Sequence, residues 1–426
     1  MAFKIAIVGA GPVGKPSNPA ASNLDPLTAG KGCMLGRLLH QADVSVTIFE
    51  AEPAPDDRSQ GGSFDLHSKT GLAAIRDAGL WEQFVQWARY DSQALAVVDR
   101  NAKAWFSLAS PRAVMSKPEI DRVHLRRVLY QSLPQGTIRW GHRLERVDGD
   151  TLVFPGSRVS GFHLVVGADA AWSRVRPAVT SITPVYSGVG GHQLKIPDAE
   201  ATAPEVHKLV DRGTVFALDE GKELGLQQLG DGAITVSFWT VRREDWREAS
   251  PRVVSGGEAA RRAILDDMEG WHGTLRGAVD KATAACQARS LYMLPVGTRW
   301  QHREGVTLVG DAAHLMLHCA GEGVNLALQD ARTLARAIIR ASREGGPDAL
   351  DGCVAEFEED MFKRARKAQE MTDKMRIASF YTPCAPRGSM PGWVLARAKY
   401  DVHPLVYPLA FAWFHVFYLF YKLFNA

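Results

Sequence analysis

The chain has 426 residues, 46% of them hydrophobic and 23% charged, which is enough for a large core divided over one to three domains. Its net charge of +3 is too small, and its basic residues are too scattered, to indicate a nucleic-acid-binding protein. Five cysteines without metal-site spacing favour a reducing compartment, and no signal-peptide pattern precedes the first predicted strand, so we expect a cytoplasmic protein without a metal centre.

The first predicted element is a strand at Lys4–Val8, which runs into a glycine-rich turn with Gly9, Gly11 and Gly14. In a dinucleotide-binding unit the first such glycine makes the turn, the second admits a diphosphate, and the third packs the helix on the strand. A second predicted strand ends in Glu50, a suitable acceptor for ribose hydroxyls. The pattern therefore predicts a Rossmann-like cofactor-binding unit.

Glu50 nevertheless lies much farther from Gly14 than the roughly 20 residues expected between such a turn and its acid. The excess falls in residues 14–31, whose prolines are incompatible with a helix interior. Removing this stretch would join Val13 to Gly32 and restore a normal turn and helix. Two interpretations stay open: an atypical in-frame insertion, such as an unspliced intron read as protein, or a genuine loop at the start of the helix.

The next segments carry charged residues suited to a phosphate-containing cofactor. Arg58 could pair with a phosphate, or it could be a solvated loop residue. Asp65 follows soon after, and its simpler role would be to cap a helix or turn. A helix predicted at 119–129 carries Arg122, for which a surface charge is the alternative, and the strand that begins segment 164–176 is followed by Asp169.

Residues 183–290 contain alternating apolar runs, such as Ala233–Trp239, which are typical of an antiparallel sheet. Gln193 and Gln227 lie on two of the predicted strands and are candidate substrate contacts, although exposed polar positions would also explain them. A similar run at Ala94–Val98 assigns residues 91–119 to the same unit.

The segment Val306–Asn325 is the most informative. A buried strand should end at a Gly-Asp pair, whose carboxylate can accept a hydrogen bond from a sugar-like hydroxyl, and glycines should then open a helix toward a phosphate or ring. The candidates are Gly310, Asp311, Gly321, Gly323 and Asn325. His318 lies between the two motifs and is a candidate proton shuttle, against the alternative of a packed histidine.

The C-terminal run 404–420 is apolar and aromatic apart from His415, and Pro408 interrupts it. A spanning helix needs about 20 apolar residues, so the run is marginal. We expect either peripheral attachment to an intracellular membrane or a terminal helix packed on the body or on another copy, and the oligomeric state stays open.

These motifs together resemble those of class A flavoprotein monooxygenases, the group of p-hydroxybenzoate hydroxylase, and most of all its tetracycline-inactivating branch. The resemblance covers nearly the whole chain except the 14–31 stretch and the tail. It implies an α/β fold with a Rossmann-like FAD-binding domain, an inserted antiparallel-sheet substrate domain and a C-terminal helical tail. The corresponding residues are 1–90, 120–182 and 291–375 for the first, 91–119 and 183–290 for the second, and 376–426 for the tail.

The resemblance also implies an activity. FAD, reduced by NADPH, would react with O2 and pass one oxygen atom to a bulky small molecule, in fungal natural-product biosynthesis. By the same resemblance Arg58, Asp65, Arg122 and Asp169 would lie at the flavin or the nicotinamide cofactor. Ala170 stands where the family has glycine, and the segment around His318 lacks the usual prolines. These departures leave an alternative, a protein of the same fold that no longer oxygenates and acts as a cyclase or isomerase.

Overall fold

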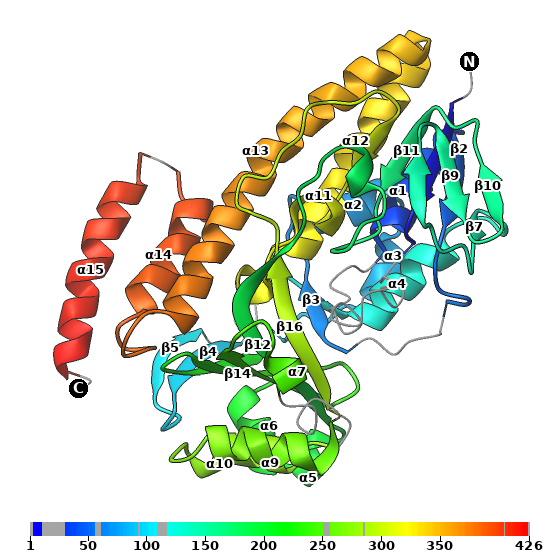
Figure 1. The fold of residues 1–426 in the computed structure, drawn as a ribbon. Helices are drawn as coiled ribbons and strands as arrows, with labels where there is room; N and C mark the ends of the chain where they lie inside the picture. Colours follow the sequence, from blue (N-terminus) through cyan, green and yellow to red (C-terminus); the bar gives the residue numbers. More distant parts are fainter. Residues whose placement is uncertain are drawn as a thin grey trace.

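The computed structural model describes residues 3–10, 30–55, 61–92, 94–108, 117–249, 256–283, 286–403 and 405–424. A parallel sheet near the N-terminus and a larger, mainly antiparallel sheet organise these residues, and long helices connect the two (Figure 1). The expected fold class, a Rossmann-like unit with an antiparallel sheet and a helical C-terminus, is confirmed.

The parallel sheet has the strand order β17-β11-β1-β2-β7, and every neighbouring pair in it is parallel. Its strands are β1 (Lys4–Val8), β2 (Ser45–Phe49), β7 (Ile138–Arg139), β11 (Leu164–Gly167) and β17 (Val306–Leu308). β1 has the sequence Lys-Ile-Ala-Ile-Val and is buried from its second residue onward. Such a continuous apolar run is what a parallel strand covered on both faces requires.

Helices and a small antiparallel sheet surround the parallel sheet and enclose the largest core. They are α1 (Lys31–His40), α2 (Gly71–Asp77), α3 (Trp81–Val85), α4 (Arg122–Gln131) and α12 (Gly323–Glu344), with β8 (Arg146–Asp148), β9 (Thr151–Phe154) and β10 (Ser157–Val159). α12 buries Leu328, Ala331, Leu334 and Ile338. Their spacing of three and four residues places them on one helix face.

The larger sheet has the order β16-β12-β15-β14-β13-β4-β5, in which only β4 and β13 are parallel neighbours. Its strands are β4 (Leu95–Asp99), β5 (Ala104–Leu108), β12 (Val185–Ile196), β13 (Thr214–Asp219), β14 (Lys222–Gln228), β15 (Ile234–Val241) and β16 (Gln287–Met293). One face of this sheet packs in an apolar core under α6 (Pro204–Val210), α9 (Gly257–Asp267) and α10 (Gly273–Asp280). Two short helices, α5 (Ala199–Thr202) and α7 (Trp246–Ala249), lie at its periphery.

Several shorter elements and one long helix join the two sheets. The short elements are the ribbon of β3 (Ser63–Asp65) and β6 (Glu119–Asp121), the helix α11 (Asp311–His314), and the 3-10 turns η2 (Arg176–Ala178) and η3 (His318–Ala320). The 34-residue helix α13 (Pro347–Phe380) runs from the parallel sheet to the antiparallel sheet, and α14 (Met390–Asp401) packs against it (Figure 1).

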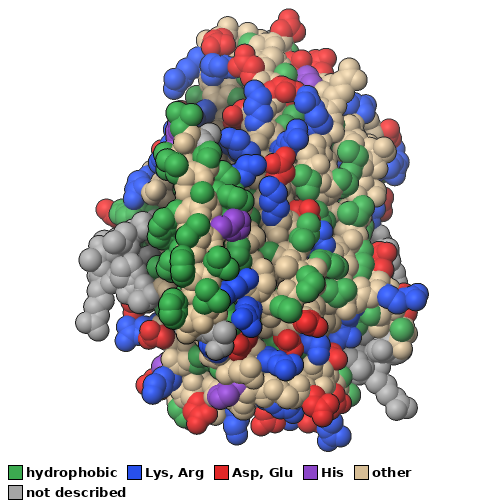
Figure 2. Space-filling model, turned by 90° about the vertical axis from the view of Figure 1, so that its left-hand side faces the viewer, with side chains coloured by type: hydrophobic (Ala, Val, Ile, Leu, Met, Phe, Trp, Pro, Cys, Tyr) green, Lys and Arg blue, Asp and Glu red, His purple; other side chains and the backbone are tan. Residues whose placement is uncertain are grey.

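The last helix, α15 (Tyr407–Phe424), contacts the body through a narrow face. Tyr418 is buried there, with Phe414 and Tyr421 beside it. Large apolar side chains cover the opposite face, and Figure 2 shows them as a column of hydrophobic groups on the surface. None of the helices in the described ranges has the length and apolar character needed to cross a bilayer.

Candidate active site

Four strands of the parallel sheet end at one edge, and a sequence-predicted site residue follows each of them. Gly9 follows β1, Glu50 follows β2, Asp169 follows β11, and Asp311 follows β17. Because the carboxyl ends of parallel strands share one edge of a sheet, these residues lie close together although the chain separates them widely.

Glu50 is almost fully buried at this edge. Its carboxylate accepts hydrogen bonds from the backbone N–H groups of Ala10, at 2.7 Å, and of Glu52, at 3.0 Å. Burial raises the pKa of Glu50, and the two hydrogen bonds partly offset this effect. The carboxylate is therefore held against the glycine-rich turn that follows β1.

Gly9 and Gly32 make the closest backbone approach of this region. Gly9 has a φ of +100°, and a Cβ on Gly32 would lie 1.9 Å from the Gly9 carbonyl oxygen. Gly32 thus takes the position in which a fingerprint glycine packs the helix on the strand. Gly11, Gly14 and most of the 14–31 stretch lie outside the described residues, as does Arg58.

Lys31, which the sequence did not single out, lies next to this contact. It is the first residue of α1, and its side chain is buried against Gly310. Its Nζ lies 3.0 Å from Oδ1 of Asp311, without the geometry of a hydrogen bond. The carboxylate expected to meet a cofactor hydroxyl therefore has a lysine as its neighbour in this structure.

Arg176 ties the loop after β11 to the loop after β17. Its guanidinium donates to the carbonyl oxygens of Ala312 at 2.7 Å and Ala171 at 2.8 Å, and burial lowers its pKa to about 10. Asp169 accepts hydrogen bonds from the backbone N–H groups of the following turn, while its other oxygen, Oδ1, is buried without a hydrogen-bond partner. Ala170 has a φ of +64°, so the alanine occupies the left-handed conformation that favours glycine.

His314 and Asp330 hold the turn at Gly310 in place. Asp330 Oδ2 lies 2.6 Å from His314 Nε2 and accepts a hydrogen bond from the Gly310 N–H, and Arg364 pairs with Oδ1 at 2.8 Å. Burial opposes ionisation of Asp330, but His314 and Arg364 outweigh it and hold its pKa at about 2. All these partners are structural, so His314 is a fixed part of the turn.

Asp65 and Asn325 meet on the other side of the site. Asn325 is fully buried, donates to the Asp65 carbonyl at 2.9 Å and accepts from the His67 N–H at 2.8 Å. The His67 ring lies 3.0 Å from the Asp65 carboxylate, and Gly321 adjoins the same carboxylate with a φ of +66°. Gly323 begins α12 immediately afterward and has open space at its Cα.

Arg122 lies between this group and the antiparallel sheet. Its guanidinium stacks on the Phe64 ring at 4.6 Å, and it adjoins Gly62, whose φ is +93°. The sequence predicts Arg122 near the cofactor. In the structure it is the first residue of α4, and its backbone N–H donates to the Gly62 carbonyl oxygen just before β3, the strand that ends in Asp65.

The antiparallel sheet turns a polar face away from its apolar core. Strand register puts Gln193 opposite Ser237, and Gln227 opposite Thr235, so all four side chains share one face. Gln227 also accepts a hydrogen bond from the Ser63 N–H at 3.1 Å. Both glutamines therefore lie on the face that the β3–β6 ribbon adjoins.

Two glycines on the strands of this face, Gly191 and Gly225, pack closely against β15. Gly191 pairs with Trp239, and a Cβ on Gly191 would lie 2.0 Å from the Phe238 carbonyl oxygen. Gly225, between Glu223 and Gln227 on β14, approaches Ser237 in the same way. At both positions the missing Cβ allows a close approach of β15.

His318 joins the polar face to the loop before α12. Its Nε2 lies 3.9 Å from Oε1 of Glu223, and its ring lies 5.5 Å from that of Trp239. Glu223 and Trp239 are buried cross-strand neighbours, and the Trp239 Nε1 has no hydrogen-bond partner. The sequence missed both residues, because alternation within a strand does not tell which face meets the cofactor layer.

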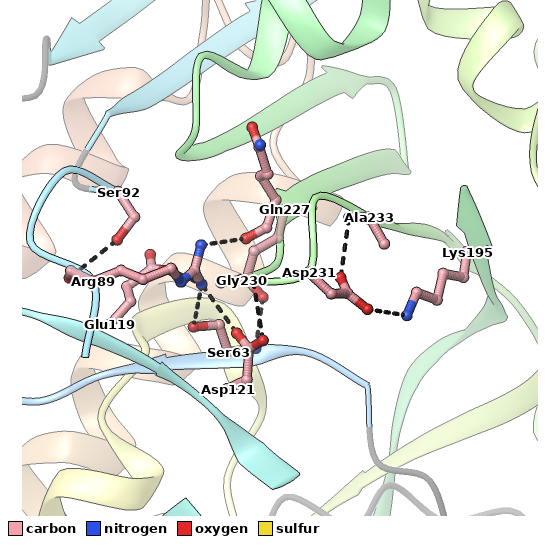
Figure 3. Close-up of polar contacts among 11 residues, drawn as sticks. Ser63, Arg89, Ser92, Glu119, Asp121, Lys195, Gln227, Gly230, Asp231 and Ala233 are labelled. Atoms are coloured by element: carbon pink, nitrogen blue, oxygen red, sulfur yellow. Dashed lines mark hydrogen bonds and ion pairs between the residues drawn. The ribbon is translucent and has the colours of Figure 1, made fainter. Parts of the chain in front are cut away.

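Arg89 fixes the junction between the two layers (Figure 3). Its Nη2 donates to Ser63, Glu119 and Asp121 at 3.0 to 3.1 Å, and Asp121 also accepts from the Gly230 N–H. Burial raises the pKa of Glu119 to about 8; Arg89 opposes this rise, whereas Asp65 and Asp121 add to it. Within the described ranges, no cluster of His, Cys, Asp and Glu could hold a metal ion.

Known proteins share this sequence pattern. The profile of a family described as FAD binding domain matches residues 28–368. The chain is similar to monooxygenase penA of Penicillium thymicola, with 30% identity over 87% of this chain and 94% of penA. It is also similar to monooxygenase asqM of Emericella nidulans, with 28% identity over 89% of this chain and 96% of asqM.

Solved structures share the fold. A salicylate hydroxylase substrate complex superposes with a TM-score of 0.70 at 17% identity, over 93% of this chain and 94% of the other. Tetracycline destructase Tet(51) gives 0.66 at 14% identity, over 94% and 97%. HpxO of Klebsiella pneumoniae complexed with FAD and uric acid gives 0.68 at 18% identity, over 94% and 93%.

Proposed function

We propose a reaction for this chain from one premise: the chain belongs to the FAD-binding domain family, among the class A flavoprotein monooxygenases. The reaction is the NADPH- and O2-dependent transfer of one oxygen atom to a bulky small molecule of natural-product biosynthesis. The observation that carries it is the meeting of Gly9, Glu50 and Asp311 at one edge of the parallel sheet, from which the loop after β17 reaches the polar face of the antiparallel sheet at His318.

FAD fits the residues at this edge. The Gly9–Gly32 approach excludes any side chain, as a strand–turn–helix unit around a diphosphate requires. The Asp169 Oδ1 is a buried acceptor without a hydrogen-bond partner. Bound FAD would supply the redox chemistry with NADPH and O2, and the protein would bind and orient it and exclude water.

Each residue then has a definite role in binding. The Glu50 carboxylate would accept from the adenosine ribose, Asp311 from the ribityl chain, and the free N–H groups at the start of α1 would face the diphosphate. Asp65, Arg122 and Asn325 would hold the flavin end. The parallel-sheet layer acts in this proposal as the cofactor domain, and the antiparallel sheet as the substrate domain.

The substrate would lie on the polar face of the antiparallel sheet. Gln193 and Gln227 share this face, and they would donate or accept hydrogen bonds at the rim of a flat, polycyclic molecule. The His318 imidazole, backed by Glu223, would take a proton from an acidic hydroxyl or N–H of the substrate and return it later.

The visible spectrum of the purified protein and its oxygen consumption, measured with an oxygen electrode, test this function. We expect the purified protein to be yellow, to release FAD on heating, and to consume NADPH and O2 in equal amounts when a hydroxylated polycyclic aromatic is supplied. His318→Asn should shift the pH profile of this consumption without loss of FAD. Colourless protein that takes up no added FAD would refute the proposal. Substrate conversion without NADPH or O2 would instead indicate the cyclase or isomerase alternative, which the similarity to monooxygenases does not favour.

We also propose that α15 rests on an anionic membrane surface. Leu409, Trp413, Val416, Phe420 and Leu423 recur at spacings of three and four residues and form one exposed apolar stripe (Figure 2). Aromatic side chains favour the headgroup region. The helix has no acidic residue, and its charged residue is Lys422, which suits anionic headgroups.

Vesicle sedimentation tests this contact. The protein should sediment with vesicles that contain phosphatidylserine and less with pure phosphatidylcholine, and the double variant Trp413→Glu/Phe420→Glu should remain in solution. His403→Gln, outside the stripe, is the matched control. A concentration-dependent dimer that the double variant disperses, without vesicle binding, would show that a second copy covers the stripe.

A further inference from the structure

Helix α14, the second-last helix, contacts the turn beside the residues around Asp65 and Asn325. Arg397 lies on this helix, and its Nη1 lies 2.6 Å from Oε1 of Glu322. The same Nη1 donates to the Ala320 carbonyl oxygen at 3.3 Å. Its Nε pairs with Asp401 at 2.7 Å, which orients the guanidinium from the solvent side.

Glu322 stands at the turn where α12 begins. It lies between Gly321 and Gly323, and only 3% of its side chain is exposed. His67 is a second charged or polar neighbour: its Nδ1 lies 3.5 Å from Oε1 of Glu322, and its Nε2 lies 3.0 Å from Asp65. Arg397, Glu322, His67 and Asp65 therefore form one continuous chain of contacts from α14 to the site.

This chain of contacts surrounds one buried carboxylate, that of Glu322, whereas the Asp65 side chain is 40% exposed. The two carboxylates lie beside a turn that should receive an anionic cofactor. Without a guanidinium, the Glu322 carboxylate would keep only a histidine as a charged partner, and a buried carboxylate that loses its partner is strongly unfavourable. The turn 320–323 would then relax so that the carboxylate reaches water, and its backbone would leave the position shown here.

We propose that Arg397 is a positioning residue of the cofactor site, which holds the turn 320–323 in the conformation that FAD needs. The proposal rests on the FAD-binding function argued above. Arg397 lies beyond residues 28–368, the part of the chain that the family profile matches. The C-terminal helices of this protein thus complete a site that the family segment alone would leave open.

FAD titration of the apoprotein tests the proposal. Arg397→Gln should bind FAD about tenfold more weakly than the unchanged protein, since a charge-assisted hydrogen bond in a buried place is lost. Arg397→Lys should recover part of the affinity, because an ammonium keeps the charge but not both contacts. Arg243→Gln is the matched control, since it removes a guanidinium whose exposed pair with Asp245 lies outside this chain of contacts, and it should leave the FAD affinity unchanged.

A second variant and a second measurement separate positioning from folding. Glu322→Gln in the Arg397→Gln background removes the unpaired carboxylate and should restore most of the FAD affinity. Thermal unfolding of each apoprotein shows whether the fold is retained. The proposal is overturned if Arg397→Gln lowers the melting temperature but binds FAD as tightly as the unchanged protein. Failure of the unchanged protein to bind FAD would instead refute the proposed function, and this inference with it.

Discussion

Lys31 and Asp311 form a buried ion pair across the Gly9–Gly32 contact, with Nζ 3.0 Å from Oδ1. The lysine ends the stretch 14–31 that interrupts the glycine-rich turn, and the aspartate follows the strand β17. In the proposed complex the Asp311 carboxylate would accept from the ribityl chain. Lys31 and FAD would then compete for the same carboxylate.

Replacing the lysine should relieve this competition. We expect Lys31→Met to bind FAD roughly fivefold to tenfold more tightly. In this variant Asp311 can accept a hydrogen bond from the cofactor without first breaking an ion pair. Fluorescence titration of the apoprotein measures the dissociation constant. Lys195→Met, which breaks the exposed pair with Asp231, is the control and should change nothing. Weaker binding by Lys31→Met would mean that the lysine pairs with the diphosphate.

Removing residues 14–31 should have a larger effect than Lys31→Met. The deletion joins Val13 to Gly32, so the helix with its free N–H groups starts directly after the turn. We expect a fold at least as stable as that of the full chain and tighter FAD binding. Titration of both variants side by side measures the difference. Equal affinity of the two would identify Lys31 alone as the obstacle, and weaker binding by the deletion variant would make the stretch a functional loop.

Asp311 should matter most when Lys31 is absent. In the Lys31→Met background, Asp311→Asn should cost about 1–3 kcal/mol of FAD binding free energy, because a charged acceptor becomes a neutral one. The background avoids the stability loss that a buried, unpaired Lys31 would cause. Asp231→Asn in the same background is the control. An unchanged dissociation constant would remove Asp311 from the list of cofactor ligands.

Ala170→Gly should stabilise the protein. The alanine sits at φ +64°, a conformation that costs an L-residue about 1–2 kcal/mol, whereas glycine adopts it freely. Glycine also has more conformational freedom in the unfolded chain. This freedom lowers the stability by about 0.4–1 kcal/mol and cancels part of the gain. We expect a net increase of roughly 0.5–1 kcal/mol in the free energy of unfolding by urea. Ala171→Gly, next to it but without a positive φ, should destabilise; a loss in both variants would contradict the strain argument.

His302 should make stability depend on pH. Burial disfavours its protonated form, but hydrogen bonds to Glu358 and Asp351, at 2.8 and 2.9 Å, outweigh burial and raise its pKa. Because the folded-state pKa exceeds the unfolded one, this contribution is complete below about pH 6.5 and is lost as the pH rises through the folded value.

The variant His302→Gln isolates this contribution. Its free energy of unfolding should fall below that of the unchanged protein at about pH 6, and the difference should shrink toward about pH 9. Urea unfolding across this range measures it, with the exposed His415→Gln as control. A difference that grows with pH would show that Glu358 and Asp351 do not stabilise the protonated ring.

Local sequence determined the elements and the family. The glycine-rich turn, the acid after β2 and the Gly-Asp pair after β17 are recognisable because each performs its task through backbone conformation and a short spacing. The sequence also shows the helical spacing of the apolar residues in α12 and the alanine at position 170, where the family has glycine. Both features involve only a few neighbouring residues.

Tertiary structure decided which distant residues meet. No local pattern links Lys31 to Asp311, Glu223 to His318, or Arg397 to Glu322, because each pair joins segments that only the packing of sheet, loop and helix brings together. Alternation along β14 shows that two faces exist, but only the tertiary contacts of Glu223 with His318 and of Gln227 with Ser63 show which face adjoins the loop before α12 and the β3–β6 ribbon. Sequence thus determined the chemistry available to this protein, and the fold decided which of its charges lie within reach of one another.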